Sequence, residues 1–170
     1  MSDTIIRHVV VPGTFDPVTL GHLDVIARTR RMFSQVTIGV AASLTKNGSG
    51  PHFSLEERAQ MLRESIVELR ISQGEEIRPF SGLLMDLCRT IGADGVVKGL
   101  RAMTDFEYEL QQADLNYRLA PEVESIFVMG SPRHGYISSS IVRELALMGG
   151  DVSFLVPACV KRRLATLHEA

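Results

Sequence analysis

Short runs rich in valine and isoleucine alternate with longer amphipathic segments along the chain, and this alternation constrains the fold more than any other feature. We predict five strands from these runs, at Arg7–Val11, Val36–Ala42, Glu76–Phe80, Gly95–Lys98 and Ser125–Met129. The helical patterns lie at His22–Phe33, Ser54–Leu69, Leu83–Ile91, Thr104–Leu119, Ser139–Met148 and Cys159–Leu167. Regular alternation of strand and helix predicts a parallel sheet with right-handed crossovers and helices on both faces. We therefore expect a doubly wound α/β fold with a five-stranded parallel sheet, in a single domain that spans residues 1–170.

The composition excludes several classes of protein. A length of 170 residues suits one domain, and 18 Lys and Arg against 20 Asp and Glu argue against a strongly basic nucleic-acid binder. The two cysteines lie far apart without a C-x-x-C pattern, which argues against a zinc site and fits reduced thiols in the cytosol. The N-terminus lacks the pattern of a signal peptide, and no apolar run is long enough to span a bilayer. We expect a cytoplasmic protein with neither membrane nor nucleic-acid partners.

The chemistry is expected where strands end, because ligands of open α/β sheets bind beyond the carboxyl ends of the strands. The first predicted strand leads through Gly13–Pro17 to Thr19-Leu20-Gly21-His22 and a helix, without either common glycine-rich nucleotide motif. The start of a helix attracts anions, Gly21 would allow close approach of a phosphate, and His22 would direct a ring N–H toward it. The alternative is an ordinary loop whose histidine caps a helix.

Further donors follow the other strands. Lys46 follows the second strand, Lys98 and Arg101 follow the fourth, and Ser138–Ser140 follow the fifth. Each group also has a plainer interpretation. Lys46 would be an ordinary surface lysine, Lys98 and Arg101 would form a salt bridge to Asp105 or Glu107, and the serines would cap a helix. A parallel sheet nevertheless brings all these strand ends to one edge. A polyphosphate site requires hydrogen-bond donors and cations. It requires no carboxylate pair, catalytic cysteine or metal cage.

Gly13–Pro17 followed by Thr19-x-Gly21-His22 resembles the signature of nucleotidyltransferases with a (His or Thr)-x-Gly-His motif, which have a Rossmann-like fold. Nearly the whole chain is similar to the phosphopantetheine adenylyltransferases, through Ala42-Ser43 with Lys46, Phe53–Arg58, Gly99–Arg101, Asp105–Glu109 and Ile137–Ser140. These bacterial enzymes join ATP and 4′-phosphopantetheine into dephospho-coenzyme A and pyrophosphate, the penultimate step of coenzyme A biosynthesis. The resemblance implies a cytoplasmic homohexamer, Mg²⁺ that arrives with ATP, and coenzyme A as an expected feedback inhibitor.

The resemblance also implies roles for individual residues. His22, Lys46 and Arg101 would be catalytic. The acceptor would contact Thr14, Lys46, Leu84 and Lys98, the last of which is arginine in many relatives. ATP would contact residues near three strand ends: Thr14, Phe15, His22, Gly99, Leu100, Arg101, Glu109, His134, Gly135, Tyr136, Ile137, Ser138, Ser139 and Ser140. No residue is expected to bind metal directly.

The expected chemistry is positioning and charge stabilisation, because the acceptor phosphate is already ionised at neutral pH and needs no general base. Under this hypothesis Lys46 and Lys98 offset the repulsion between the acceptor phosphate and ATP. His22 donates to the α-phosphate, and the helix start at Ser138–Ser140 holds the leaving pyrophosphate.

Two other functions remain open from the sequence. The first is a related enzyme, a cytidylyltransferase or a nicotinamide mononucleotide adenylyltransferase, although cytidylyltransferases carry Arg-Thr-x-Gly-Ile-Ser-Thr-Thr where this chain has Arg133–Ser140. The second is a non-catalytic module that senses adenylates, which would not need His22 together with Lys46 and Lys98. Separately, Phe106, Leu110, Ala113 and Tyr117 form an apolar helical stripe that predicts core packing or a subunit contact.

Overall fold

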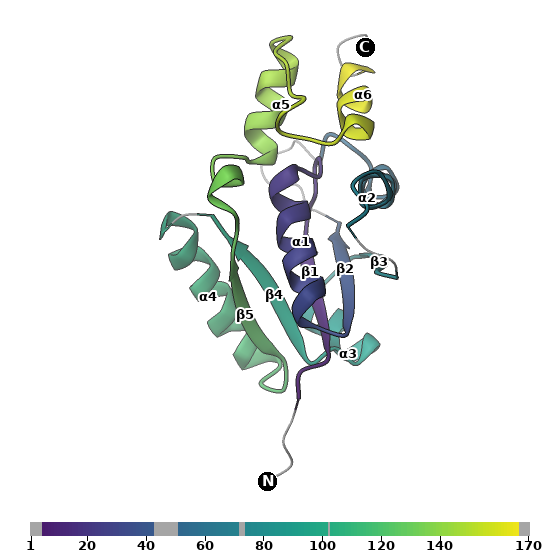
Figure 1. The fold of residues 1–170 in the computed structure, drawn as a ribbon. Helices are drawn as coiled ribbons and strands as arrows, with labels where there is room; N and C mark the ends of the chain where they lie inside the picture. Colours follow the sequence, from purple (N-terminus) through teal and green to yellow (C-terminus); the bar gives the residue numbers. More distant parts are fainter. Residues whose placement is uncertain (1–4, 43–50, 72–73, 102, 167–170) are drawn as a thin grey trace.

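The structure is a computed structural model that describes residues 5–42, 51–71, 74–101 and 103–166. Five strands form one parallel sheet in the order β3-β2-β1-β4-β5. They are β1 (His8–Gly13), β2 (Gln35–Ala41), β3 (Glu76–Phe80), β4 (Gly95–Leu100) and β5 (Glu124–Met129). The predicted doubly wound sheet is confirmed, and each strand begins and ends within two residues of the predicted position (Figure 1).

The six predicted helices are present as well. They are α1 (Leu20–Met32), α2 (Leu55–Glu68), α3 (Leu84–Ile91), α4 (Met103–Leu119), α5 (Ser139–Leu147) and α6 (Ala158–Thr166). The predicted last residue of the final helix, Leu167, lies outside the described residues. A short 3₁₀ turn, η1 (Pro132–His134), was not predicted. Within the described segments, no helix combines the length and the apolar character that crossing a membrane requires.

Helices cover both faces of the sheet because side chains of a strand alternate between its faces. Val9 and Val11 of β1 belong to the larger core, together with buried side chains of α1, α2, α5 and α6. Val10 faces the smaller core, which contains Met85 and Cys88 of α3. The alternation in a single strand thus accounts for two hydrophobic layers on opposite sides of the sheet.

The chain reverses its direction of winding between β1 and β4. It runs from β1 to β2 and β3 at one edge and then returns to place β4 on the other side of β1. β1 pairs with β2 at six positions but with β4 only at Val9↔Gly95 and Val10↔Val96. A crevice therefore opens between the carboxyl ends of β1 and β4, which is where ligands of such sheets bind.

Candidate active site

A cavity of about 300 Å³ lies where β1 and β4 stop pairing. Its floor includes Val11–Gly13 of β1 and Val97–Gly99 of β4, and its walls include the first turns of α1 and α5. The structure thus brings three of the predicted strand-end segments to one place. Lys46, the predicted contribution of the segment after β2, lies outside the described residues.

Most residues that the resemblance assigned to ATP line this cavity. They are Phe15, His22, Gly99, Arg101, Glu109, His134, Gly135, Ile137, Ser138 and Ser139. Thr14, Leu100, Tyr136 and Ser140 are neighbours of these residues in the chain but are not among the lining residues.

His22 and Thr19 cap the start of α1 reciprocally. The Thr19 backbone N–H donates to His22 Nδ1 at 3.1 Å, and the His22 backbone N–H donates to Thr19 Oγ1 at 3.3 Å. Because Nδ1 accepts this hydrogen bond, the proton of the neutral ring resides on Nε2. No described residue accepts a hydrogen bond from Nε2. Capping and an anion-binding role were alternatives in the sequence, yet one ring nitrogen caps while the other remains able to donate.

The surroundings of His22 hold its imidazole in the neutral form. Burial is the largest cause, and the nearby charges of Arg101 and Lys98 add to it, so that the pKa of His22 falls to about 4. At neutral pH the ring is therefore a neutral Nε2–H donor and not a cation.

Phe15 packs against the His22 ring from an unusual backbone conformation. Its φ of 51° lies in the left-handed region, which few non-glycine residues adopt. The Phe15 and His22 rings meet edge to face, with centroids 5.1 Å apart and planes at 74°. A Cβ at position 13 would lie 2.8 Å from the Phe15 ring, so only glycine fits there without displacing that ring. The local sequence Gly13-Thr14-Phe15 thus fixes one side of His22.

The cations of the cavity are paired with carboxylates. Arg101 Nε and Nη2 donate to Asp105 at 3.1 and 3.2 Å, and Arg101 Nη1 donates to the Ile137 carbonyl at 2.9 Å. Lys98 Nζ lies 3.4 Å from Glu109 Oε2. The salt bridge to Asp105 that the sequence left open is confirmed for Arg101. Asp105 and Glu109 both line the cavity, each beside a cation, and Glu109 was among the residues predicted to contact ATP.

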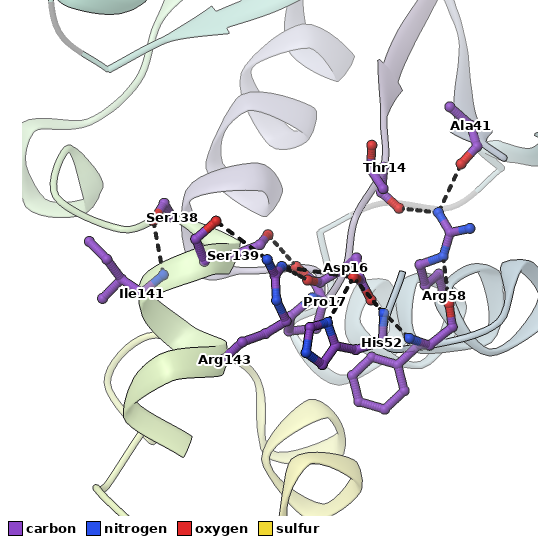
Figure 2. Close-up of polar contacts among 12 residues, drawn as sticks. Thr14, Asp16, Pro17, Ala41, His52, Arg58, Ser138, Ser139, Ile141 and Arg143 are labelled. Carbon is purple, nitrogen blue, oxygen red and sulfur yellow. Dashed lines mark hydrogen bonds and ion pairs between the residues drawn. The ribbon is translucent and has the colours of Figure 1, made fainter. Parts of the chain in front are cut away.

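The three serines at the start of α5 make different contacts, and Figure 2 shows those of Ser138 and Ser139. Ser138 Oγ accepts a hydrogen bond from the Ile141 N–H at 3.2 Å, which makes Ser138 the helix cap. Ser139 Oγ donates to the Pro17 carbonyl at 2.8 Å, and Ser140 Oγ accepts from Arg143 Nη2 at 3.4 Å. In this structure the hydroxyls cap the helix and join it to the turn after β1.

A second cavity of about 330 Å³ adjoins the first. Lys98 and Glu109 line both cavities, and Leu84, Tyr108 and Asn116 line the second one alone. The predicted acceptor residues Leu84 and Lys98 thus lie together, whereas Thr14 lines neither cavity. The Lys98–Glu109 ion pair stands between the two spaces.

Asp24 is a structural residue of the site that sequence reasoning missed. Its Oδ2 accepts a hydrogen bond from the Ser131 N–H at 2.7 Å and so holds η1 at the edge of the cavity. Asp24 also pairs with Arg28 four residues later, at 2.9 Å. That helical spacing was the only signal in the sequence, and it does not reveal the contact to residue 131.

The chain is similar to known nucleotidyltransferases. A family model described as cytidylyltransferase-like matches residues 10–145. The phosphopantetheine adenylyltransferase of Caulobacter vibrioides is 46% identical over 153 residues, covering 90% of this chain and 92% of the relative. The enzyme of the same name from Rhodospirillum rubrum is 46% identical over 164 residues, covering 96% and 94%.

Solved structures share the fold at lower identity. A bifunctional NMN adenylyltransferase/ADP ribose pyrophosphatase from Francisella tularensis superposes with a TM-score of 0.72 at 18% identity, covering 98% of this chain and 51% of that chain. A second structure of that bifunctional protein contains AMP and a Mn ion. A lipopolysaccharide core biosynthesis protein from Thermoplasma volcanium gives a TM-score of 0.51 at 21% identity, covering 74% and 96%.

Sequence identity over nearly the whole length, together with the matching family model, decides among the candidates that the sequence left open. The chain is a nucleotidyltransferase, and it belongs to the phosphopantetheine adenylyltransferase family.

Proposed function

We propose that this chain uses the two adjoining cavities to transfer the adenylyl group of ATP to 4′-phosphopantetheine, forming dephospho-coenzyme A and releasing pyrophosphate. The reaction is that of its family, and the observation that carries the assignment to this site is the neutral His22. Its Nε2–H lies in a cavity that also holds Lys98 and Arg101. We treat residues 1–170 as one catalytic domain that acts in the cytoplasm, without nucleic-acid or membrane partners.

The nucleotide occupies the first cavity and the acceptor occupies the second. This arrangement is supported by the residues that line each space, since Gly99, Arg101 and the start of α5 line the first, while Leu84 lines the second. Lys98 lines both, so the acceptor phosphate and the triphosphate meet beside its ammonium group. Opposite charge at this point offsets the repulsion between the two phosphates.

The reaction needs no general base. An oxygen of the ionised acceptor phosphate attacks the α-phosphorus of ATP, a new P–O bond forms, and the bond to the bridging oxygen of pyrophosphate breaks. His22 Nε2–H donates to a non-bridging α-phosphate oxygen as negative charge accumulates there. The first turn of α5, with Ser138 at its cap, stabilises the leaving pyrophosphate through its free backbone N–H groups. Arg101 completes the cationic lining of the cavity, and Lys46, which lies outside the described residues, keeps the catalytic role that the resemblance implies.

We assign Mg²⁺ to the bound ATP and not to a protein cage. Among the residues that the structure describes, no group of three or more His, Cys, Asp or Glu side chains is placed to hold a metal ion. The oxygens of the triphosphate are the ligands that Mg²⁺ prefers, and the bound ion neutralises part of their charge.

We also propose that the protein is a homohexamer that coenzyme A inhibits. The exposed apolar side chains of α4 support self-association, because large apolar patches on a surface usually mark contacts between proteins. They are Phe106, Tyr108, Leu110, Leu115, Tyr117 and Leu119. Light scattering is expected to give six times the mass of one 18.7 kDa chain, and a monomer would contradict the assignment.

Pyrophosphate release with three substrate pairs tests the reaction. We expect release with ATP and 4′-phosphopantetheine, and far less with CTP and glycerol 3-phosphate or with ATP and nicotinamide mononucleotide. Failure with phosphopantetheine would overturn the proposed function. His22→Ala should lower kcat by ~10²–10³, the usual loss for one preorganised donor, and leave the affinity for ATP nearly unchanged. Near-normal turnover of His22→Ala would refute the role of His22.

A further inference from the structure

The turn after β1 is held by side chains from two distant helices (Figure 2). Arg58 of α2 donates from Nη1 to the Thr14 carbonyl at 2.6 Å. Arg143 of α5 donates from Nη1 to the Asp16 carbonyl, and Ser139 donates to the Pro17 carbonyl at 2.8 Å. Three backbone acceptors of a four-residue turn are therefore satisfied from outside the turn.

The Asp16 side chain ties the same turn to the start of α2. Its Oδ2 accepts from the His52 N–H at 2.9 Å, and its Oδ1 accepts from the Phe53 N–H at 3.0 Å. Arg143 Nη1 lies 3.8 Å from Oδ2, and the His52 ring lies 3.7 Å from it. Asp16 is only 6% exposed, so these contacts compensate for burial of its carboxylate.

Arg58 joins three segments of main chain. It is 2% exposed, and besides the Thr14 carbonyl it donates to the Ala41 carbonyl at 2.8 Å and to the Phe53 carbonyl at 3.1 Å. The end of β1, the end of β2 and the start of α2 are thus connected through one guanidinium. Such a buried side chain, bonded only to backbone, fixes the relative positions of the segments that it contacts.

The turn carries Phe15, whose conformation depends on this support. A non-glycine residue in the left-handed region costs energy and persists only where its surroundings hold it. The Phe15 side chain is 3% exposed and packs edge-on against the ring of His22. Movement of residues 14–17 would therefore shift Phe15 and open one side of His22.

We propose that Asp16, Arg58 and Arg143 are positioning residues for adenylyl transfer, which act by holding Phe15 against the His22 ring. None of the three lines either cavity, so their effect is exerted through the turn. The inference rests on the proposed function and adds to it the machinery that orients the donor.

A matched pair of variants separates positioning from stability. Asp94 accepts two backbone hydrogen bonds at the opposite end of β1, from the Arg7 and His8 N–H groups at 3.0 Å each. Asp94→Ala and Asp16→Ala each remove a carboxylate that accepts two backbone bonds, and both should lower the urea midpoint of unfolding. We expect Asp16→Ala to lower kcat by ~10- to 100-fold, because a misplacement of about 1 Å can cost ~10²-fold in rate. Asp94→Ala should keep the wild-type kcat, and neither variant should change the KM for ATP by more than about threefold.

Two further measurements depend on His22 itself. The ring of His22, whose pKa is lowered to about 4 in the native protein, should titrate closer to 6.5 by NMR in Asp16→Ala and stay near 4 in Asp94→Ala. In a His22→Asn background, Asp16→Ala should cause less than a threefold further loss of kcat, because its effect passes through a ring that is no longer there.

A second variant keeps the test decisive if Asp16→Ala does not fold. The Arg143 side chain is 23% exposed, so Arg143→Gln should fold and still lose the bond to the Asp16 carbonyl. Arg63→Gln, which removes an exposed arginine that pairs with Glu56, is its control.

The positioning role would be overturned if Asp16→Ala and Asp94→Ala had equal kcat values. It would also be overturned if the kcat losses of Asp16→Ala and His22→Asn simply added in the double variant. If instead the wild-type protein does not adenylylate phosphopantetheine, the proposed function fails, and the NMR titration still tests whether Asp16 holds the surroundings of His22.

Discussion

Protonation of His22 should make the folded protein measurably less stable at acidic pH. Burial, followed by the charges of Arg101 and Lys98, lowers the His22 pKa from 6.5 to about 4. Between these two values the unfolded chain binds a proton that the folded protein does not bind. The contribution of His22 to stability is therefore fully present above pH 6.5 and is lost as the pH falls toward 4. The difference of 2.5 pH units (6.5 − 4) corresponds to roughly 3 kcal/mol of unfolding free energy.

Urea unfolding of wild type and His22→Asn across this pH range isolates the effect. Other groups titrate alike in the two proteins, so the difference between their unfolding free energies reports on His22. We expect wild type to lose roughly 3 kcal/mol relative to His22→Asn between pH 7 and pH 4. NMR titration of the ring C–H signals gives the pKa directly. In Lys98→Met the pKa should rise by less than the full shift, because burial is the largest cause.

A His22 ring that titrates at pH 6 or above would contradict the lowered pKa and the burial that causes it. A constant free-energy difference between wild type and His22→Asn from pH 7 to pH 4 would contradict it as well. Either result would mean that His22 is solvated and that, with a pKa of about 6 to 6.5, about 10–25% of it is cationic at pH 7. An imidazolium would then be available as the donor to the α-phosphate, beside the neutral ring.

Two predictions concern stability away from His22. Glu68 accepts hydrogen bonds from the Ala158 and Cys159 N–H groups at 2.8 and 3.0 Å and so caps the start of α6. Glu68→Ala should therefore lower the free energy of unfolding in urea by about 1 kcal/mol. A change below about 0.3 kcal/mol would show that water replaces the cap. A Cβ on Gly99 would lie 2.5 Å from Val25 Cγ2. Gly99→Ala should therefore lower the free energy of unfolding by ~1–3 kcal/mol. If this clash is the cause, adding Val25→Ala to the Gly99→Ala protein should restore part of the lost stability.

The sheet was predictable because its signal is local and repeated. The valine-rich run of β1 reads as a strand without knowledge of its neighbours, and the S-L-E-E start of α2 forms the capping box that its spacing indicates. The turn η1 gave no such signal. It spans three residues and is held by Asp24, which lies more than one hundred residues earlier in the chain.

The pairing of charges at the site could be predicted only in part. Asp105 follows Arg101 by four residues, so its salt bridge could be weighed as an alternative from spacing alone. Glu109 and Lys98 meet because α4 packs against β4, which spacing does not reveal. Arg58 lies next to Ala59 in a helix whose apolar face is buried, and nothing in that pattern shows that a guanidinium is buried there too.

The reciprocal cap between Thr19 and His22 makes the first turn of α1 a portable unit. The four residues Thr19–His22 start the helix and select the ring tautomer by contacts made within those four positions. A designer who places this tetrapeptide at the start of a helix in another α/β scaffold carries over a ring protonated on Nε2, but not the Phe15 packing that holds the ring in place. The low pKa would not follow, because burial and two cations from β4 and the loop after it create it. The tautomer of the donor is therefore encoded locally, whereas its final orientation and its charge state belong to the whole fold.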